Sequence, residues 1–169
     1  MDEQEIKVAE TLKRLAEKLP RFEDGRINYH DANEAAVLTC LVKFKDKILI
    51  LKRSDKVWTY KGKWNSVAGY MDEFKPLRQK ALEELNEELG ISKEQISDLK
   101  LGKPFEFFDE KIKKKWIIHP VLSELKQKPE IKLDFEHTDF KWISPEEIKN
   151  YDVVPNLRQS VGQFFHLKS

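Results

Sequence analysis

The chain has 169 residues, of which 40% are hydrophobic and 36% charged, and its formal net charge is +1. This length fits one domain with a sizeable core, and the hydrophobic content argues against a disordered chain. A net charge this close to zero creates no overall field that would draw the protein to nucleic acid or to a membrane surface, so neither is expected as a partner.

The single cysteine, Cys40, lies in an apolar strand pattern and has no second cysteine with which to form an internal disulfide. This is typical of a reducing compartment. The first residues, MDEQEIKVAE, are unlike a signal peptide, and no apolar run approaches the 18 residues of a membrane-spanning helix. We therefore expect a cytoplasmic protein in which Cys40 is buried and unreactive.

The predicted elements begin with an amphipathic helix over residues 2–19, which stops at Pro20 and presents Ile6, Leu12, Leu15 and Leu19 on one face. Strands are predicted over residues 35–44, 47–53, 64–70, 104–109, 115–125, 131–135 and 138–143. Helices are predicted over residues 76–89 and 155–167. A short helix is predicted to begin at Ser144, where a capping box marks its start. We expect residues 1–34 to form the first helix and a linker, and residues 35–169 to form an α/β/α sandwich with a mixed sheet.

The helix over residues 76–89 has a regular apolar face made by Leu77, Ala81, Leu85 and Leu89. Pro76 suits its first position, and Gly90 suits a left-handed C-terminal cap.

The same helix carries Glu83, Glu84, Glu87 and Glu88 close to its C-terminus. Glu84, Glu87 and Glu88 share one face, where like charges repel by roughly 0.2–0.5 kcal/mol per pair and also face the negative end of the helix dipole. Two interpretations are open: a solvated acidic face, which is common in so charged a chain, or a site that holds a cation.

The segment from Gly69 to Ile91 resembles the box of Nudix hydrolases. That pattern is Gly, five residues, Glu, seven residues, Arg-Glu-aliphatic, one residue, Glu-Glu, one residue, Gly-aliphatic. Its positions are filled here by Gly69, Glu84, Leu85, Glu87, Glu88, Gly90 and Ile91. The strand ending LILKR, the segment GKWNSVAGY and the strand FKWISPEEI also look like those of the family, so the resemblance covers roughly residues 35–150.

Two positions of the box depart from the family pattern. Lys75 stands in place of the box glutamate, and Glu83 stands in place of the box arginine. Because the two departures exchange sign, we expect Lys75 and Glu83 to form an ion pair, which would be the same pair reversed if the family's glutamate and arginine contact each other.

The resemblance implies that Glu84, Glu87 and Glu88 are metal ligands, with a backbone carbonyl near Ala68 or at Gly69 as a further ligand. Carboxylate and carbonyl oxygens are the ligands that Mg²⁺ prefers, and Mn²⁺ is the expected substitute. A divalent cation at a diphosphate neutralises developing charge and lowers the pKa of bound water.

The general base is expected to be a box glutamate, Glu84 or Glu87, or a carboxylate of the later segment LDFEHTDFKWI. That segment offers Asp134, Glu136 and Asp139, of which Glu136 is preferred, although an ordinary polar loop is an equally good interpretation. A histidine in such a loop, His137, is interpreted as solvated rather than as a substrate contact.

Substrate contacts are expected from Arg53, which ends the strand LILKR, and from Trp58 and Tyr60 in the loop that follows. Arginine can neutralise phosphate and the aromatic rings can stack on a planar group. The alternative for Arg53 is a surface charge. Trp58 and Tyr60 are favoured by their loop position over the strand rings Phe105 and Phe107, for which core packing is expected. His119, between the apolar runs WII and PVL, is interpreted as structural.

The resulting hypothesis is a Mg²⁺-dependent hydrolase that cleaves a diphosphate bond in a nucleoside diphosphate linked to another moiety. The alternative is a nucleotide-binding module of the same fold with weak or no turnover, which the Lys75 and Glu83 departures would mark. The partner expected in both cases is a small diphosphate compound. Three roles of the N-terminal helix are open: a cap on the domain, a contact in a homodimer, or a wall of the pocket.

Overall fold

The computed structural model describes residues 2–168. Its first element is helix α1 (Glu3–Lys18), whose N-terminus is capped by Asp2, because the Gln4 N–H donates to a carboxylate oxygen of Asp2 at 2.8 Å. Ile6, predicted on the buried face, is 42% exposed. It lies about 120° around the helix from Leu12, whereas Val8 lies only about 40° away and is buried in its place. The buried face consists of Val8, Leu12, Leu15 and Ala16.

The sheet is mixed and contains eight strands among the described residues. They are β1 (Glu34–Phe44), β2 (Lys47–Arg53), β3 (Trp64–Asn65), β4 (Val67–Tyr70), β5 (Ile96–Leu101), β6 (Phe105–Asp109), β7 (Lys114–Leu125) and β8 (His137–Ile143). β1 and β7 run parallel to each other, with Leu38 opposite His119. β4 pairs antiparallel with β1, and this places Gly69 opposite Leu38 at the middle of the sheet.

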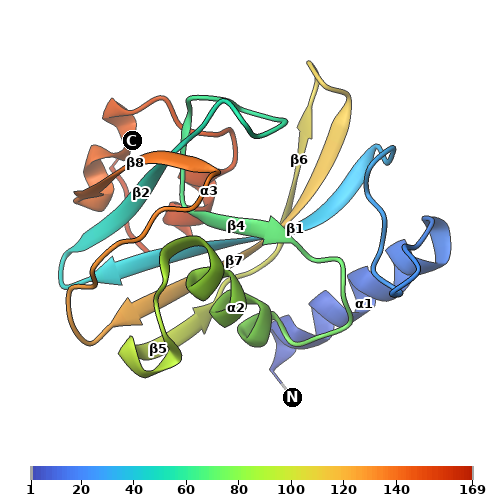
Figure 1. Cartoon of the computed structure of the whole chain (residues 1–169), viewed down its shortest axis with the longest axis horizontal. Coiled ribbons are helices and arrows are strands. Elements are labelled where there is room, and N and C mark those ends of the chain that lie inside the picture. The colour runs from blue at the N-terminus through green and yellow to red at the C-terminus, as the bar shows by residue number, and fades with distance from the viewer. Residues whose placement is uncertain (1, 169) are drawn as a thin grey trace.

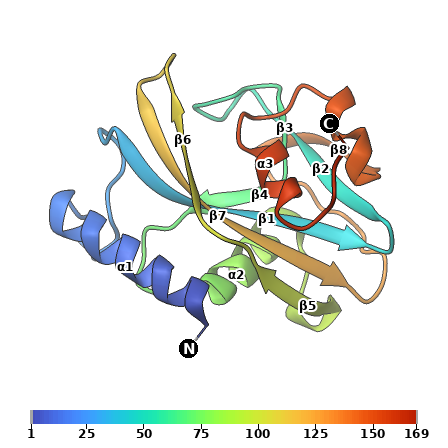
Figure 2. The same ribbon diagram turned by 180° about the vertical axis from the view of Figure 1, so that it is seen from behind.

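Alternation of side chains along the strands divides the core into two layers. In β2, Leu49 and Leu51 pack in the same cluster as α1 and α2 (Leu77–Leu89), whereas Ile48 and Ile50 pack with α3 (Leu157–Gly162). Helix α2 lies in front of the sheet in Figure 1, and α3 lies in front of it in Figure 2. The architecture is the predicted α/β/α sandwich with a mixed sheet and an N-terminal helix.

Helix α2 is held at both ends. It begins at Leu77, one residue after the predicted start, and the N–H groups of Leu77 and Arg78 donate to the Glu5 carboxylate at 2.6 and 3.4 Å. A side chain of α1 therefore caps α2. The helix ends at Gly90, whose φ of 71° is the predicted left-handed cap. The helices of the described residues include none that is long and apolar enough to cross a membrane.

The strand predicted over residues 131–135 is wrong. This segment crosses the C-terminal end of α2, where the Lys132 N–H donates to the Leu89 carbonyl at 3.2 Å. Ile131 and Leu133 pack partly buried against the core. Their alternation therefore reflects packing on a helix end rather than pairing in the sheet.

Smaller differences occur elsewhere. The predicted strand over residues 64–70 is two strands, because the chain changes partner at Ser66, whose hydroxyl donates to the Cys40 carbonyl at 2.6 Å. β5 was not predicted, since it is a half-exposed edge strand with a polar sequence. The helix predicted over residues 155–167 is observed as α3, which is shorter than predicted. The segment that Ser144 opens is a 3₁₀ helix, η2 (Pro145–Asn150), with the predicted capping box.

Candidate active site

One cavity of about 590 Å³ is strongly acidic. Two cations face it, Arg26 and Lys80, against seven carboxylates. The carboxylates come from α2, from the β4–α2 loop and from the segment before β8, and they are Asp72, Glu73, Glu84, Glu87, Glu88, Asp134 and Glu136. Residues far apart in sequence therefore converge on one concentration of negative charge. Asp139, the third carboxylate considered in that segment, is exposed on β8 and does not line this cavity.

The three glutamates of α2 differ in burial. Glu87 is exposed, the Glu84 side chain is 12% exposed, and Glu88 is only 3% exposed. A solvated acidic face would expose all three side chains, and charged residues are rarely buried unless they are paired. The burial of Glu84 and Glu88 therefore argues against the solvated-face interpretation.

Gly69 provides the space that Glu84 occupies. A Cβ atom at Gly69 would lie 2.6 Å from Cδ and 2.8 Å from Oε1 of Glu84. Only glycine lets the helix carboxylate lie this close to the backbone of β4. The structure therefore brings Gly69 and Glu84, both predicted as metal ligands, into direct contact at the cavity wall.

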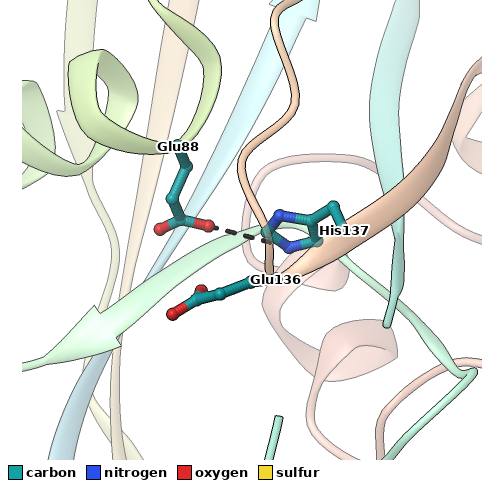
Figure 3. A group of neighbouring side chains, drawn as sticks. All are labelled: Glu88, Glu136 and His137. Carbon is teal, nitrogen blue, oxygen red and sulfur yellow. Dashed lines mark ion pairs between the residues drawn. The ribbon is translucent and has the colours of Figure 1, made fainter. Parts of the chain in front are cut away.

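Figure 3 shows the Glu88 carboxylate directed at the His137 ring, with the Glu136 carboxylate below that of Glu88 in this view. One ligand atom from each lies within 4.8 Å of the others, and His137 Nε2 is 3.7 Å from Glu88 Oε1. The other ring nitrogen of His137, Nδ1, is 3.1 Å from Asp134 Oδ1. Interpreting His137 as solvated was wrong, because its side chain is 2% exposed and lies against Glu88 and Asp134, which line the acidic cavity.

Burial changes the protonation of these carboxyl groups. It raises the pKa of Glu88 well above the usual range, and the neighbouring Glu84 raises it further. Burial also raises the pKa of Glu84. The pKa of Glu136 is raised for the same reason, with Asp134 adding to the effect. A cation bound among these groups would offset both the desolvation and the mutual repulsion.

The reversed box pair is present. Lys75 Nζ lies 2.9 Å and 3.0 Å from the two carboxylate oxygens of Glu83. Lys75 also lies 3.3 Å from Glu73. Lys80 lies 3.4 Å from Glu84, so one cation of the helix already faces a predicted metal ligand.

A second cavity, of about 580 Å³, adjoins the acidic one. Both cavities are lined by Arg26, Ala68, Gly69, Tyr70, Asp72, Phe135 and Glu136, which form their common border. The second cavity has the opposite character, since cations and aromatic rings line it. Its lining includes Arg53, Lys56, Trp58, Tyr60, Lys114 and Trp116.

Arg53 organises the loop between β2 and β3. Its Nε and Nη2 donate to the Thr59 carbonyl at 3.0 and 2.8 Å. Burial lowers the pKa of Arg53, while the carboxylate of Glu136 acts in the opposite direction. Arg53 is therefore a partly buried loop anchor that lines the second cavity, and it is not a free surface charge.

Trp58 and Tyr60 lie in this loop but differ in their contacts. Trp58 is 80% exposed and packs edge-on against His30, with 5.1 Å between ring centroids. Tyr60 donates to Asp109 Oδ2 at 2.6 Å and accepts from Trp116 Nε1 at 3.1 Å. Tyr60 is thus fixed by hydrogen bonds, whereas Trp58 is open to solvent.

Sequence reasoning missed the aromatic wall that the N-terminal segment supplies. Tyr29 stacks on Tyr70 with 5.4 Å between centroids and 23° between ring planes. Lys114 Nζ lies 4.8 Å from the centroid of the Trp116 ring. Tyr29 and Arg26 precede the resemblance, so no motif pointed to them; only the fold brings residues 22–30 to this cavity.

The cavity fits a divalent cation on structural grounds. Among the described residues, Glu88 Oε2 is buried and has no hydrogen-bond partner. An orphaned buried carboxylate oxygen beside two more carboxylates is the donor set that hard divalent cations take. The residues that could hold the ion are Gly69 (through its backbone carbonyl), Glu84, Glu87, Glu88, Glu136 and His137.

A mixed sheet sandwiched by helices, with an acidic helix after a glycine-bearing strand, defines the class of the protein as Nudix-like. The sequence matches the NUDIX domain over residues 32–164, and the chain belongs to this family. No curated protein sequence matches the chain.

Solved structures show the same fold. A MutT protein from Methanosarcina mazei Go1 aligns at 24% identity over 78% of this chain and 92% of its own, with a TM-score of 0.63. An Ap4A hydrolase from C. elegans aligns at 19% identity over 77% and 94%, with a TM-score of 0.61. The NUDIX domain of Shewanella oneidensis NrtR, complexed with ADP ribose, aligns at 15% identity over 77% and 85%, with a TM-score of 0.64.

Proposed function

We propose that the protein is a Mg²⁺-dependent hydrolase that cleaves a diphosphate bond in a nucleoside diphosphate linked to another moiety. The observation that carries this proposal is the common border of the two cavities at Gly69, Tyr70 and Glu136. A nucleoside diphosphate has a planar base and a charged diphosphate at one end. An aromatic cavity suits the first and a metal-binding acidic cavity the second.

The metal would be held by Glu84, Glu87, Glu88 and the Gly69 carbonyl. When bound, it supplies charge neutralisation at the diphosphate and acidifies a coordinated water. Glu136 is the proposed general base, because it borders both cavities and burial raises its pKa, which makes the carboxylate a better proton acceptor. Glu84 and Glu87 are the other carboxylates that can accept this proton.

The second cavity would take the nucleoside. Arg53 and Arg26 place positive charge along it, which suits phosphate oxygens. Trp58 is the most exposed ring at its edge and is free to stack on a base, whereas the hydrogen bonds of Tyr60 hold the wall in place. Cys40, the single cysteine, is buried and free, which supports a cytoplasmic location.

The test is a hydrolysis panel with Mg²⁺. Nucleoside triphosphates, nucleotide sugars, ADP-ribose and dinucleotide polyphosphates are offered to the wild type and to the Glu87→Gln variant. Glu87 is exposed, so its loss should not disturb folding. The control is Glu94→Gln, which neutralises an exposed glutamate of the short 3₁₀ helix η1 (Lys93–Gln95) outside both cavities.

We expect metal-dependent release of a phosphate or nucleotide product from at least one class. Turnover should fall at least about tenfold in Glu87→Gln, the scale of a disrupted metal site, and stay unchanged in Glu94→Gln. Equal turnover in all three proteins would contradict the role of Glu87.

The alternative is a nucleotide-binding module without turnover, which the departures at Lys75 and Glu83 favour. The same panel separates the two. If no compound is cleaved while one of them raises the melting temperature in the presence of Mg²⁺, the binding module is the better proposal.

A further inference from the structure

His137 has a defined tautomer. An ionised carboxylate can only accept hydrogen bonds, so the 3.1 Å contact with Asp134 Oδ1 places a proton on His137 Nδ1. Asp134 is itself fixed, because the same oxygen accepts the Glu136 N–H at 3.1 Å. The imidazole is therefore held in one orientation, with Nε2 directed at Glu88.

When Glu88 is ionised, the atoms that His137 Nε2 faces are also acceptors. Glu88 Oε1 lies 3.7 Å away, and among the described residues Glu88 Oε2 has no partner. Lone pairs of an imidazole and of two carboxylates, those of Glu88 and Glu136, thus converge in a buried space.

A bound metal ion would accept these lone pairs and so remove the repulsion between them. Two ligand atoms on one ion lie about 3–4 Å apart when the bonds are about 2.1 Å long, and the 3.7 Å between Nε2 and Oε1 falls in that range. A metal-bound imidazole usually donates the N–H of its other ring nitrogen to a carboxylate, which fixes the orientation of the ring. Asp134 has that position here.

We infer that His137 Nε2 and Glu88, beside Glu136, form a metal site that takes a divalent ion with affinity for imidazole nitrogen, such as Mn²⁺, Co²⁺ or Zn²⁺. Affinity for imidazole nitrogen rises from Mn²⁺ to Co²⁺ and Zn²⁺, whereas Mg²⁺ prefers a shell made of oxygen. This inference deepens the proposed function, on which it rests, by naming the ion class that the acidic cavity takes. His137 gives the site a selectivity that carboxylates alone would not provide.

The decisive variant is His137→Asn. The asparagine side-chain nitrogen takes the place of Nδ1 and can still donate to Asp134, while the nitrogen that faces Glu88 is removed. The control is His119→Asn, the same substitution at a histidine that is buried on β7 and does not belong to the group formed by Glu88, Glu136 and His137.

Binding of Mn²⁺, Zn²⁺ and Mg²⁺ is measured by calorimetric titration of the metal-free proteins. In His137→Asn we expect Mn²⁺ and Zn²⁺ affinity to fall by at least about 10-fold, because the variant removes a ligand atom and even loss of a supporting residue costs about 10- to 100-fold. Mg²⁺ affinity should stay within about threefold, as an oxygen-only shell predicts. The metal-free melting temperature should change little, and His119→Asn should leave all three affinities unchanged.

A structural role for His137 would give another pattern. Mg²⁺ and Mn²⁺ affinities would then fall together with the melting temperature, or neither would change, and both results overturn the inference. The titrations contain no nucleotide, so they decide the metal site even if the hydrolysis panel shows no turnover.

A measurement on the wild type covers the case in which His137→Asn does not fold. Pulsed electron paramagnetic resonance of bound Mn²⁺ detects the ¹⁴N coupling of a coordinated imidazole. We expect this coupling at one equivalent of Mn²⁺. Its absence would overturn the assignment of His137.

Discussion

The Gly69→Ala variant tests whether the position of the Glu84 carboxylate controls metal binding. The added Cβ would lie 2.6 Å from Glu84 Cδ, whereas ordinary contact begins near 3.4 Å. The carboxylate must therefore retreat by about 0.8 Å, since atoms at van der Waals distance cannot overlap further without a steep cost. The atoms that have to move are the far end of a flexible side chain.

The expected effects on binding and on folding differ in size. Mg²⁺ requires nearly ideal octahedral geometry with bonds of about 2.0–2.1 Å, so we expect its affinity to fall at least about tenfold. Misplacement of a reacting group by about 1 Å costs about 100-fold in rate, and kcat/KM should fall on that scale. The backbone of Gly69 has no positive φ, so alanine should change the free energy of unfolding by no more than about 1 kcal/mol.

The assay combines calorimetric titration of Mg²⁺ with urea denaturation of the metal-free protein. Gly162→Ala is the matched control, because a Cβ at Gly162 would meet no atom within 4 Å and its φ is also compatible with alanine. A folded Gly69→Ala protein that binds Mg²⁺ as tightly as the wild type would refute the reasoning. Equal losses in Gly69→Ala and Gly162→Ala would refute it too.

Three further predictions concern stability. The variants Lys75→Glu and Glu83→Arg should each lower the melting temperature. In a double-mutant cycle the double variant should be more stable than the sum of the single losses predicts, by about 0.5 kcal/mol in the free energy of unfolding. Additive losses would exclude the ion pair. Burial lowers the pKa of His119 to about 4, so its neutral form stabilises the fold fully above pH 6.5, and about 3 kcal/mol is lost as the pH falls toward 4. Urea denaturation between pH 7 and 4.5 should therefore show a weaker pH dependence for His119→Leu than for the wild type, and identical profiles would contradict this. Tyr60→Phe removes the hydrogen bond to Asp109 and should lower the free energy of unfolding by about 1–3 kcal/mol, and an unchanged urea midpoint would show that this bond contributes nothing.

The parts of the fold that were predictable from sequence depend on local periodicity. The apolar stripe of α2 and the glycine at its end specify one helix in one register, and Gly90 has the predicted left-handed conformation. The same periodicity places Glu84 and Glu88 on one face of the helix. What it cannot give is burial, because burial depends on which segments cover that face.

The covering segments were not predictable for physical reasons. Residues 131–135 alternate in polarity as a strand does, but they pack on the end of α2 instead of pairing. His137 follows a polar loop in the sequence and is nevertheless buried, since that loop folds over the acidic cavity. Tyr29 lies outside any motif and is held at its cavity by a hydrogen bond that its hydroxyl donates to the Met71 carbonyl at 2.7 Å. Each of these contacts joins segments distant in sequence, which local patterns do not encode.

The degenerate box is best understood through the Lys75–Glu83 contact. An ion pair depends on opposite charges at a fixed distance, and exchanging the two signs keeps the attraction between partners unchanged. The hydrogen bond from Lys75 to Glu83 still connects the loop after β4 to the first half of α2. That tie holds Gly69 and Glu84 near each other, whichever partner carries the positive charge. The exchange does place a cation near the acidic cavity, where it also contacts Glu73 at 3.3 Å. Because Glu84, Glu87 and Glu88 keep their positions on α2, loss of the family's polarity at Lys75 and Glu83 gives no physical reason for loss of metal binding.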